Sequence, residues 1–427
     1  MGGLTVEAPQ IDWDPRSQRA IDDPMAMRKA IRDAGPVVRL ADGSWVVGRY
    51  EDVRKTFVET DTFLNKDSAF GFDAEDEIYK GTPIETLRDI FRGAPTGNDG
   101  ETHQKVREVV ARPLTVPQLK DFRPEFEQLA AGIVEKLCER GTFEVMTELA
   151  EAFGLAAVLP RIGVPPDEAA KLLPWQRNLF DLFDDPMDPE VNRIFRESLD
   201  YLLDPGLRNR VCPHSWSAHV EQGTKTGSDL GPAFFPGLMS VLVYGSLDNT
   251  INHITEMVRL FAVNPEQWNR LRENPSLVNG TVNEVVRLFR QGPLGGYAFR
   301  RADRDAKIAE IDIPKGTFIG LNFVSANRDE RHYPDPEKFD IGRSNADHVG
   351  FGFARHVCPG MHLAKLEMQV LLQELIKRVE TWEILDVEEK HRTVAHRVVK
   401  MHVRVRPSAD VAQFGGYMGE NRVNTVI

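Results

Sequence analysis

One loop restricts the fold of this 427-residue chain more than any other feature, because it holds a cysteine directly before a helix pattern. Residues 351–360 read Phe-Gly-Phe-Ala-Arg-His-Val-Cys-Pro-Gly, and apolar residues then recur at helical spacing to about Val379. Unpaired N–H groups at a helix start stabilise a thiolate, and Arg355 and His356 add positive charge. The pattern favours the interpretation that Cys358 is a metal ligand over the alternative that it is an ordinary small apolar residue in the core.

The remaining cysteines indicate no disulfide framework. Cys138 and Cys212 are widely spaced, no Cys-x-x-Cys pair exists, and three cysteines leave one unpaired. We therefore interpret these two as packing residues and expect a reducing, cytoplasmic location.

Composition excludes several other classes of protein. Hydrophobic residues make up 41% and charged residues 28%, which is normal for a globular chain and unlike a disordered or membrane-embedded one. The formal charge of -12 argues against a protein that coats nucleic acid. We recognise no targeting signal, and the longest apolar stretch, 233–247, is interrupted by Pro236 and Gly237 and is too short to span a bilayer.

The pattern along the chain predicts a mainly α fold with a small β region, in a single domain over 1–427. A β-hairpin is expected within 30–60, where β-branched residues flank Asp42-Gly43. Helices are expected over about 100–290, and turns with short strands over 292–360. A strand is expected at 398–405, and the tail 407–427 has no usable periodicity.

The cysteine loop resembles the haem-binding loop of the cytochrome P450 family, Phe-Gly-x-Gly-x-His-x-Cys-x-Gly. Ala354 replaces the second glycine, which adds a methyl group and removes no ligand. The resemblance implies haem b, with Cys358 as the axial iron ligand, Phe351 beside the sulfur, His356 at a propionate and Gly360 completing the motif.

A second motif resembles the family's Glu-x-x-Arg signature. Glu284 and Arg287 lie three residues apart in a helical pattern, so both face one side and can meet Arg343 in the later meander. Such a pair alone is more often a solvated salt bridge. Its position before the meander of residues 334–343 supports the resemblance.

Haem carries two propionates, and buried charges need cationic or donor partners. His103 and Arg107 lie four residues apart and resemble the family's His-x-x-x-Arg helix. Arg300 is carried over from a segment similar to Arg-x-Ala-x-x-Asp, with Arg301 left open as an alternative. The resemblance implies that these residues and His356 hold the propionates.

Residues 233–262 predict one continuous helix, ~45 Å long. In the family this helix passes the haem and carries an acid followed by threonine, which deliver protons. Here the acid is Asp248, the next residue is Asn249, and Thr250 follows. An amide binds water but is no proton source as a hydroxyl is, so Asn249 is a departure. The buried acid is open to a second interpretation, as a structural cap or kink partner.

The stretch around Asp248 most resembles the bacterial monoterpene hydroxylases of the camphor and cineole type. We expect a substrate pocket lined by Val241, Tyr244, Gly245 and Leu294, and by the segment 70–95. Tyr244 is the weakest member, since an aromatic residue at this spacing is more often core. The substrate is expected to be small and hydrophobic, such as a terpenoid or an aromatic ether.

The resemblance implies a monooxygenase that inserts one oxygen atom of O2 into a C–H bond, giving hydroxylation or dealkylation. No flavin-binding or iron–sulfur segment is recognisable, so electrons are expected from a ferredoxin or flavodoxin and its NAD(P)H-dependent reductase. Such carriers are usually acidic, and basic residues around Cys358 are the candidate docking contacts: Lys105, Arg112, Arg355 and Lys365. A peroxide-using haem enzyme and a non-enzymatic haem sensor are the alternatives.

Overall fold

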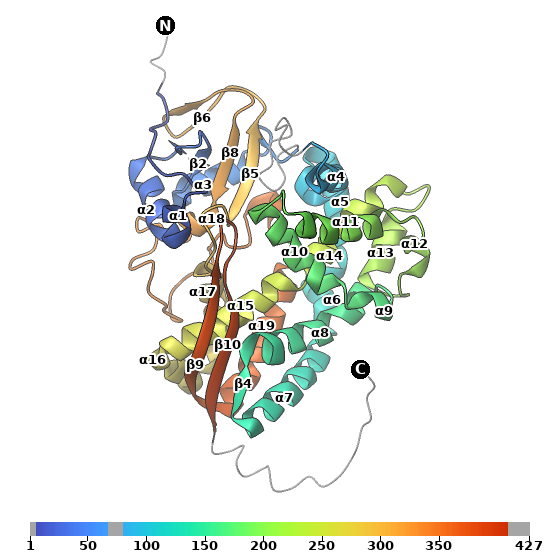
Figure 1. Cartoon of the computed structure of the whole chain (residues 1–427), viewed down its shortest axis with the longest axis vertical. Coiled ribbons are helices and arrows are strands. Elements are labelled where there is room, and N and C mark those ends of the chain that lie inside the picture. The colour runs from blue at the N-terminus through green and yellow to red at the C-terminus, as the bar shows by residue number, and fades with distance from the viewer. Residues whose placement is uncertain (1–5, 67–79, 409–427) are drawn as a thin grey trace.

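The computed structural model describes residues 6–66 and 80–408 (Figure 1). Within these ranges the chain is mainly helical, and its strands gather in a smaller part of the molecule, as expected. The tail from 409 lies outside the described residues, and so does the part of the predicted pocket segment at 70–79. No helix in the described ranges is long and apolar enough to cross a membrane.

Short helices and strands alternate in the first described part of the chain. The helices there are α1 Gln18–Asp22, α2 Pro24–Ala34, α3 Tyr50–Val58 and α4 Pro83–Phe91. The strands are β1 Val38–Arg39, β2 Trp45–Val47 and β3 Phe63–Leu64. β1 and β2 pair antiparallel, and Gly43 at the turn has φ +85°, so the predicted hairpin is confirmed.

The middle of the chain forms the helical body. Its helices are α5 Gly100–Ala111, α6 Val116–Lys120, α7 Arg123–Arg140, α8 Ala152–Ile162, α9 Pro166–Ala169, α10 Leu172–Asp184, α11 Pro189–Leu203, α12 Leu207–Arg210, α13 Trp216–Gly223, α14 Phe235–Gly245, α15 Asp248–Val263, α16 Pro265–Glu273 and α17 Val278–Arg287. A π-helical stretch, η5 Val145–Glu151, precedes α8, and short 3-10 turns are η3 Pro95–Gly97, η4 Arg112–Leu114, η6 Pro232–Phe234 and η7 Pro275–Leu277.

Strands return after α17, as the turn-rich sequence predicts. They are β5 Tyr297–Ala302, β6 Ala306–Ile308, β7 Ile311–Ile313 and β8 Phe318–Asn322, followed by α18 Phe323–Ala326, the turn η8 Ala354–His356 and α19 Met361–Arg378. Among the described residues, one sheet has the order β1-β2-β8-β5-β3, and β6 pairs with β7. A separate apolar core packs under the five-stranded sheet, while the largest core lies among the helices of the body.

A long hairpin closes the described chain. β9 Val379–His391 and β10 His396–Pro407 pair antiparallel, and the short strand β4 Thr142–Glu144 pairs with the outer side of β10. Figure 1 shows these two strands running along the helical body. The strand predicted at 398–405 is therefore confirmed as part of a longer one, whereas β9 had no prediction because charged residues interrupt its apolar pattern.

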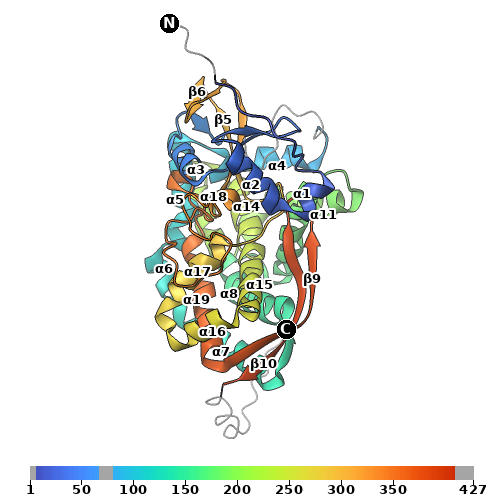
Figure 2. The ribbon, with the colours of Figure 1, turned by 90° about the vertical axis from the view of Figure 1, so that its left-hand side faces the viewer.

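The predicted continuous helix over 233–262 is wrong in one respect, because it divides into α14 and α15 around Ser246 and Leu247. The backbone N–H groups of Leu247 and Asp248 both donate to the side-chain Oε1 of Gln176, at 3.1 and 2.7 Å. These groups would otherwise bond carbonyls one turn back. Gln176 is fully buried on α10, so the break is built into the core. Figure 2 shows α15 passing beside α19 through the middle of the molecule.

Candidate active site

The cysteine loop closes on itself just before α19. The Cys358 N–H donates to the carbonyl oxygen of Phe351 at 2.7 Å, and Gly360 caps the N-terminus of the helix. Gly352 has φ +73° and Ala354 has φ +54°, so two loop residues adopt the left-handed conformation that favours glycine. The alanine that replaces the motif's second glycine therefore occupies a backbone position where glycine carries no strain.

Cys358 is a free cysteine, and the residue as a whole is partly exposed. Burial of the thiol raises its pKa above the ordinary value for cysteine, and the backbone N–H groups of Gly360 and Met361 and the charge of Arg107 offset this rise only in part. The helix-start N–H groups favour the thiolate as expected, but they do not bring its pKa below the ordinary value. The cation that lowers the pKa of the thiol is Arg107 on α5, whereas Arg355 of the loop is exposed.

The imidazoles of His103 and His356 lie together beside this loop. Their ring centroids are 4.0 Å apart, and the Nδ2 atom of Asn65 lies 2.5 Å from Nε2 of His356. Asp99 approaches the same Nε2 atom at 3.7 Å. Burial, followed by the nearby charge of His356, lowers the pKa of His103 to about 4. The two histidines, 253 residues apart in sequence, therefore share one buried polar site.

Arg300 is buried on β5, and its neighbour Arg301 lies on the other face of the strand, where its Nη1 donates to the carbonyl oxygen of Gly316. Burial lowers the pKa of Arg300 to about 10, and the charge of Asp99 raises it. The burial of Arg300 favours it over Arg301 as the residue of the predicted site.

This cationic site contains buried nitrogen atoms that have no hydrogen-bond partner in the part of the chain that the structure describes. Within the described residues, neither Nε2 of His103 nor Nε of Arg300 has a hydrogen-bond partner. Buried polar atoms are normally satisfied, so unpartnered cationic and imidazole groups fit a site for anionic groups. Together with the cysteine at a helix start, the donor set fits haem, whose iron takes a thiolate and whose propionates are anions.

The predicted contact of Glu284, Arg287 and Arg343 is present. Nε of Arg287 lies 2.8 Å from Oε2 of Glu284, and both side chains are fully buried. Nε of Arg343 lies 3.2 Å from Oε1 of the same carboxylate. Although burial raises the pKa of Glu284, the hydrogen bond and charge of Arg287 outweigh it and lower the pKa below its ordinary value. The meander is thereby pinned to α17.

Asp248 lies at the first turn of α15, where the helix resumes after its break. Its Oδ2 atom lies 3.0 Å from Nη1 of Arg397 on β10, and Oδ1 lies 3.5 Å from Nε of Arg177 on α10. The Asp248 side chain is 3% exposed and that of Arg177 is 36% exposed. The acid is therefore tied to two arginines, one of which reaches solvent, and it also stands at the kink that the second interpretation anticipated.

Exposure separates the neighbours of Asp248 into two groups. Gly245 and Asn249, one helical turn apart, are exposed, while Thr250 is buried. Tyr244 is buried, shares a 2.7 Å hydrogen bond with Ser198, and stacks on Phe195 with ring centroids 5.7 Å apart. These contacts place Tyr244 in the packed core, so its assignment to the pocket is replaced by a packing role.

The remaining predicted pocket residues lie on different elements. Val241 is partly buried on α14. Leu294 precedes β5, and its N–H donates to the carbonyl oxygen of Thr393 in the β9–β10 turn at 2.7 Å. That turn is also held by Asp184, whose Oδ1 accepts from the Thr393 hydroxyl at 2.6 Å. The hairpin tip was not anticipated as a neighbour of Leu294.

The four basic residues proposed for docking are not equivalent. Arg112 and Arg355 are exposed and line one open hollow of about 530 Å³ beside His103 and Arg107. Lys105 is paired with Glu101 at 2.8 Å, and the Lys365 ammonium lies 5.5 Å from the centre of the Phe351 ring. Arg112 and Arg355 are the pair with charge directed to solvent at this face.

Several site residues had no sequence signal. Arg177, Arg397, Gln176 and Asn65 come from distant segments and belong to no short motif. Asp99 begins the stretch that contains His103 and Arg107, but its contact with His356 was not predicted. A buried carboxylate such as that of Asp248 needs a cation beside it. The sequence therefore predicts that a basic residue lies next to Asp248, but not which residue it is.

Comparison with known proteins agrees with this geometry. A family profile described as Cytochrome P450 matches residues 254–402. Cytochrome P450 CYP199A2 of Rhodopseudomonas palustris is 30% identical over 380 residues, which cover 88% of this chain and 89% of that protein. Cytochrome P450-terp of a Pseudomonas species is 25% identical over 382 residues, which cover 83% of this chain and 87% of that protein.

Solved structures show the same fold. The cytochrome P450 CYP109Q5 from Chondromyces apiculatus superimposes with a TM-score of 0.76 at 23% identity, over 94% of this chain and 99% of that one. P450BioI, solved in complex with an acyl carrier protein that bears hexadec-9Z-enoic acid, gives a TM-score of 0.77 at 21% identity. The superposition covers 91% of this chain and 100% of that one. With the cysteine at the start of α19, the buried Glu284–Arg287 pair and a relative that matches over most of its length, the chain belongs to the cytochrome P450 family.

Proposed function

We propose that this chain is a monooxygenase that inserts one oxygen atom of O2 into a C–H bond of a small hydrophobic molecule. The observation that carries the proposal is the position of Cys358 at the N-terminal end of α19, beside buried cations with unpartnered donors. A haem held by that thiolate supplies O2 binding and O–O cleavage, which the thiolate promotes by donating electron density.

Two sets of residues would hold the haem. Cys358 would ligate its iron through Sγ, and the backbone N–H groups of Gly360 and Met361 would stabilise the charge on that sulfur. His103, Arg107, Arg300 and His356 would bind the propionates. Phe351 begins the loop, and its carbonyl oxygen accepts the N–H of Cys358 and so fixes the backbone of that residue.

Protons reach the site through the broken helix. The guanidinium of Arg177 keeps its own proton, but it is partly exposed beside the carboxylate of Asp248, so that water can bring protons to this carboxylate. The next residue, Asn249, is exposed. Asn249 binds a water molecule that passes the proton on, since its amide has no acidic proton of its own. Thr250 is buried in the described structure, and we assign it to support of the helix at this point.

The substrate lies against Val241, Gly245 and Leu294. Relatives are named for a wide range of substrates, among them a steroid C26-monooxygenase of Rhodococcus jostii and a 6-deoxyerythronolide B hydroxylase of Saccharopolyspora erythraea. A terpenoid or an aromatic ether is the proposed class for this chain, giving hydroxylation or O-dealkylation. A compound library screened for the shift of the haem absorption band on binding identifies the substrate.

Electrons come from a separate ferredoxin or flavodoxin and its reductase. The open hollow with Arg112 and Arg355 offers positive charge to an acidic carrier on the side of the Cys358 loop. The protein acts in the cytoplasm, where such carriers and NAD(P)H are present.

A cysteine variant tests the proposal directly. Cys358→Ser should lose the absorption band that the reduced carbon-monoxide adduct of a thiolate-bound haem gives, whereas Cys212→Ser should keep it. A Cys358→Ser protein that keeps the band would contradict the ligand assignment. Product formation from a compound found in the library, with incorporation of one labelled oxygen atom from O2, tests the reaction itself.

A further inference from the structure

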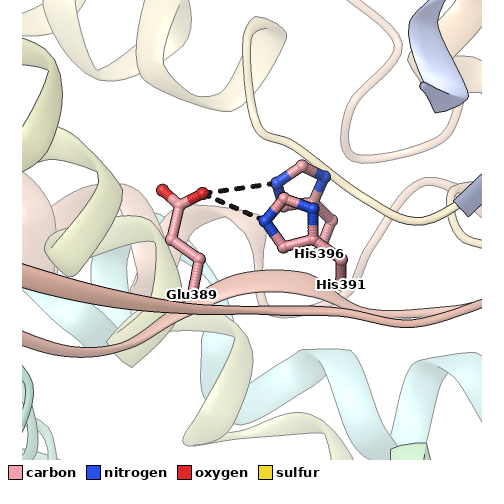
Figure 3. A group of neighbouring side chains, drawn as sticks. All are labelled: Glu389, His391 and His396. Carbon is pink, nitrogen blue, oxygen red and sulfur yellow. Dashed lines mark hydrogen bonds and ion pairs between the residues drawn. The ribbon is translucent and has the colours of Figure 1, made fainter. Parts of the chain in front are cut away.

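Three potential metal ligands meet on one face of the β9–β10 hairpin, away from the cysteine loop. Glu389 and His391 are two residues apart on β9, so their side chains leave the same face of the strand. His396 is the direct cross-strand partner of His391 in the antiparallel register. Figure 3 shows the two imidazoles side by side with the Glu389 carboxylate pointing at both.

The distances in this cluster resemble those around a bound metal. Oε2 of Glu389 lies 3.2 Å from Nε2 of His391 and 3.6 Å from Nε2 of His396. The three ligand atoms all lie within 4.8 Å of one another. Two ligands at tetrahedral angles around zinc, each about 2.1 Å from the metal, are about 3.4 Å apart. Small side-chain rotations therefore suffice to close the three atoms around one ion.

We propose that Glu389, His391 and His396 form a binding site for a divalent transition metal, with zinc the best-suited ion. Two imidazoles and one carboxylate are a ligand set that zinc takes, and a solvent molecule completes the tetrahedron. The site is independent of the proposed function, since none of the three residues belongs to the haem or proton-delivery sets.

The guanidinium of Arg290 contacts two of the three proposed ligand residues, Glu389 and His396. Its Nη2 lies 2.8 Å from Oε1 of Glu389, and its Nη1 lies 3.3 Å from Oε2 of Glu389 and 3.4 Å from Nε2 of His396. Arg290 is also paired with Glu256, through Nε and Nη2 at 3.2 Å each. A metal that takes Oε2 of Glu389 and Nε2 of His396 displaces Nη1 from both atoms, while the guanidinium keeps Glu256 and its contact with Oε1 of Glu389. Arg290 competes with the metal and then orients the ligand carboxylate.

Burial and Arg290 shift the pKa values of two of the three groups. Burial, followed by the nearby charge of Arg290, lowers the pKa of His396 to about 4, so its imidazole is neutral. Although burial raises the pKa of Glu389, the hydrogen bond and charge of Arg290 dominate and hold it at about 2, so it is ionised.

A metal here would lock the tip of the hairpin. The turn between the two strands accepts backbone hydrogen bonds from Gly292 and Leu294, at 3.0 and 2.7 Å. His396 directly precedes Arg397, the partner of Asp248. Cross-linking His391 to His396 therefore restrains a segment that contacts both the residues before β5 and the start of α15.

Equilibrium dialysis of the haem-loaded full-length protein, without an affinity tag, against zinc chloride tests the site. The bound haem occupies Cys358, so that thiol takes no zinc. The expected result is one zinc per chain, with the dissociation constant raised at least about tenfold in His391→Gln and in His396→Gln. His402→Gln is the matched control, because His402 lies on the same hairpin, paired with Asp386 at 2.7 Å, and is outside the cluster.

A second readout separates site binding from surface binding. Zinc should raise the midpoint of thermal unfolding of the wild type and of His402→Gln, and leave those of the two cluster variants unchanged. Arg290→Gln should bind zinc several-fold more tightly. No zinc bound by the wild type, equal binding in the cluster variants, or equal loss in His402→Gln would each overturn the proposal.

Discussion

The carboxylate of Asp248 and the guanidinium of Arg397 join the start of α15 to the strand β10, with Oδ2 and Nη1 3.0 Å apart. The residues are 149 positions apart in sequence. A buried ion pair of this kind is costly to break from one side, since the remaining charge is left uncompensated. The pair therefore fixes the geometry at the helix break, because it ties the first turn of α15 to β10.

Asp248→Asn should lower the rate of product formation by about a hundredfold or more, because it removes the titratable group from the proton path. The solvent deuterium isotope effect on turnover should rise, which a purely structural defect would not cause. Steady-state turnover in H2O and D2O measures both. Asp386→Asn, an exposed carboxylate on β9, is the control and should leave both quantities unchanged. Normal turnover in Asp248→Asn would contradict the assigned role.

Asn249→Ala should divert electrons from product to hydrogen peroxide, because the water that the amide holds is lost. Asn249→Thr restores the family's usual hydroxyl and should divert fewer electrons than Asn249→Ala. The ratio of peroxide and product formed to NAD(P)H consumed measures the effect. Asn264→Ala, at the far end of α15, serves as the control. Equal ratios in all variants would remove Asn249 from proton delivery.

Ala354→Gly should stabilise the protein by about 0.5–1 kcal/mol. Ala354 has φ +54°, and an L-residue in the left-handed region costs about 1–2 kcal/mol, part of which glycine's freedom in the unfolded chain cancels. The midpoint of chemical denaturation, followed by haem absorption, checks the sign. The reverse change at the neighbouring left-handed position, Gly352→Ala, should destabilise. A lower midpoint for Ala354→Gly would show that the methyl group contributes packing that outweighs the strain.

Glu284→Gln should cost about 3–5 kcal/mol of folding stability at neutral pH, because it leaves Arg287 buried without its counter-charge. The pKa of Glu284 is lowered in the folded protein, so its stabilisation is complete above its ordinary value of 4.5 and is lost as pH falls through the folded pKa. The difference between wild type and variant should therefore shrink in acid.

Urea unfolding monitored by tryptophan fluorescence at several pH values measures this difference. Glu383→Gln is the comparison, because its ion pair with Arg404 is largely exposed and should contribute less than about 1 kcal/mol. A pH-independent difference for Glu284→Gln would mean that the carboxylate charge is not the source of its stabilisation.

Arg112→Glu should slow reduction by an acidic electron carrier while substrate binding is retained, since the charge is reversed at the open face near Cys358. The effect should diminish as salt is added, because exposed charges are screened. Stopped-flow reduction kinetics and the substrate-induced absorption shift measure the two quantities. Arg193→Glu, an exposed arginine on α11, provides the control. Unchanged reduction kinetics in Arg112→Glu would exclude this face as the docking site.

Local sequence determined the parts of the site whose residues lie within a few turns of one another. The loop of residues 351–360 places Cys358 before α19 because Gly360 ends the loop and a helix pattern follows at once. Likewise, a spacing of three residues puts Glu284 and Arg287 on one helix face, whatever surrounds them. These features need no knowledge of the rest of the chain.

Only the tertiary structure decided where α14 ends and which cations hold Asp248. The apolar pattern over 233–262 is the same for a continuous and for a broken helix, and the break depends on Gln176, a hydrogen-bond acceptor 71 residues earlier. Arg397 reaches Asp248, and His396 reaches Glu389, only because the pairing register of β9 and β10 brings them there. Such contacts depend on how elements that are distant in sequence pack against each other. The periodicity of hydrophobic residues predicts which face of a helix or strand is buried, but it does not predict which partner a buried polar group will contact.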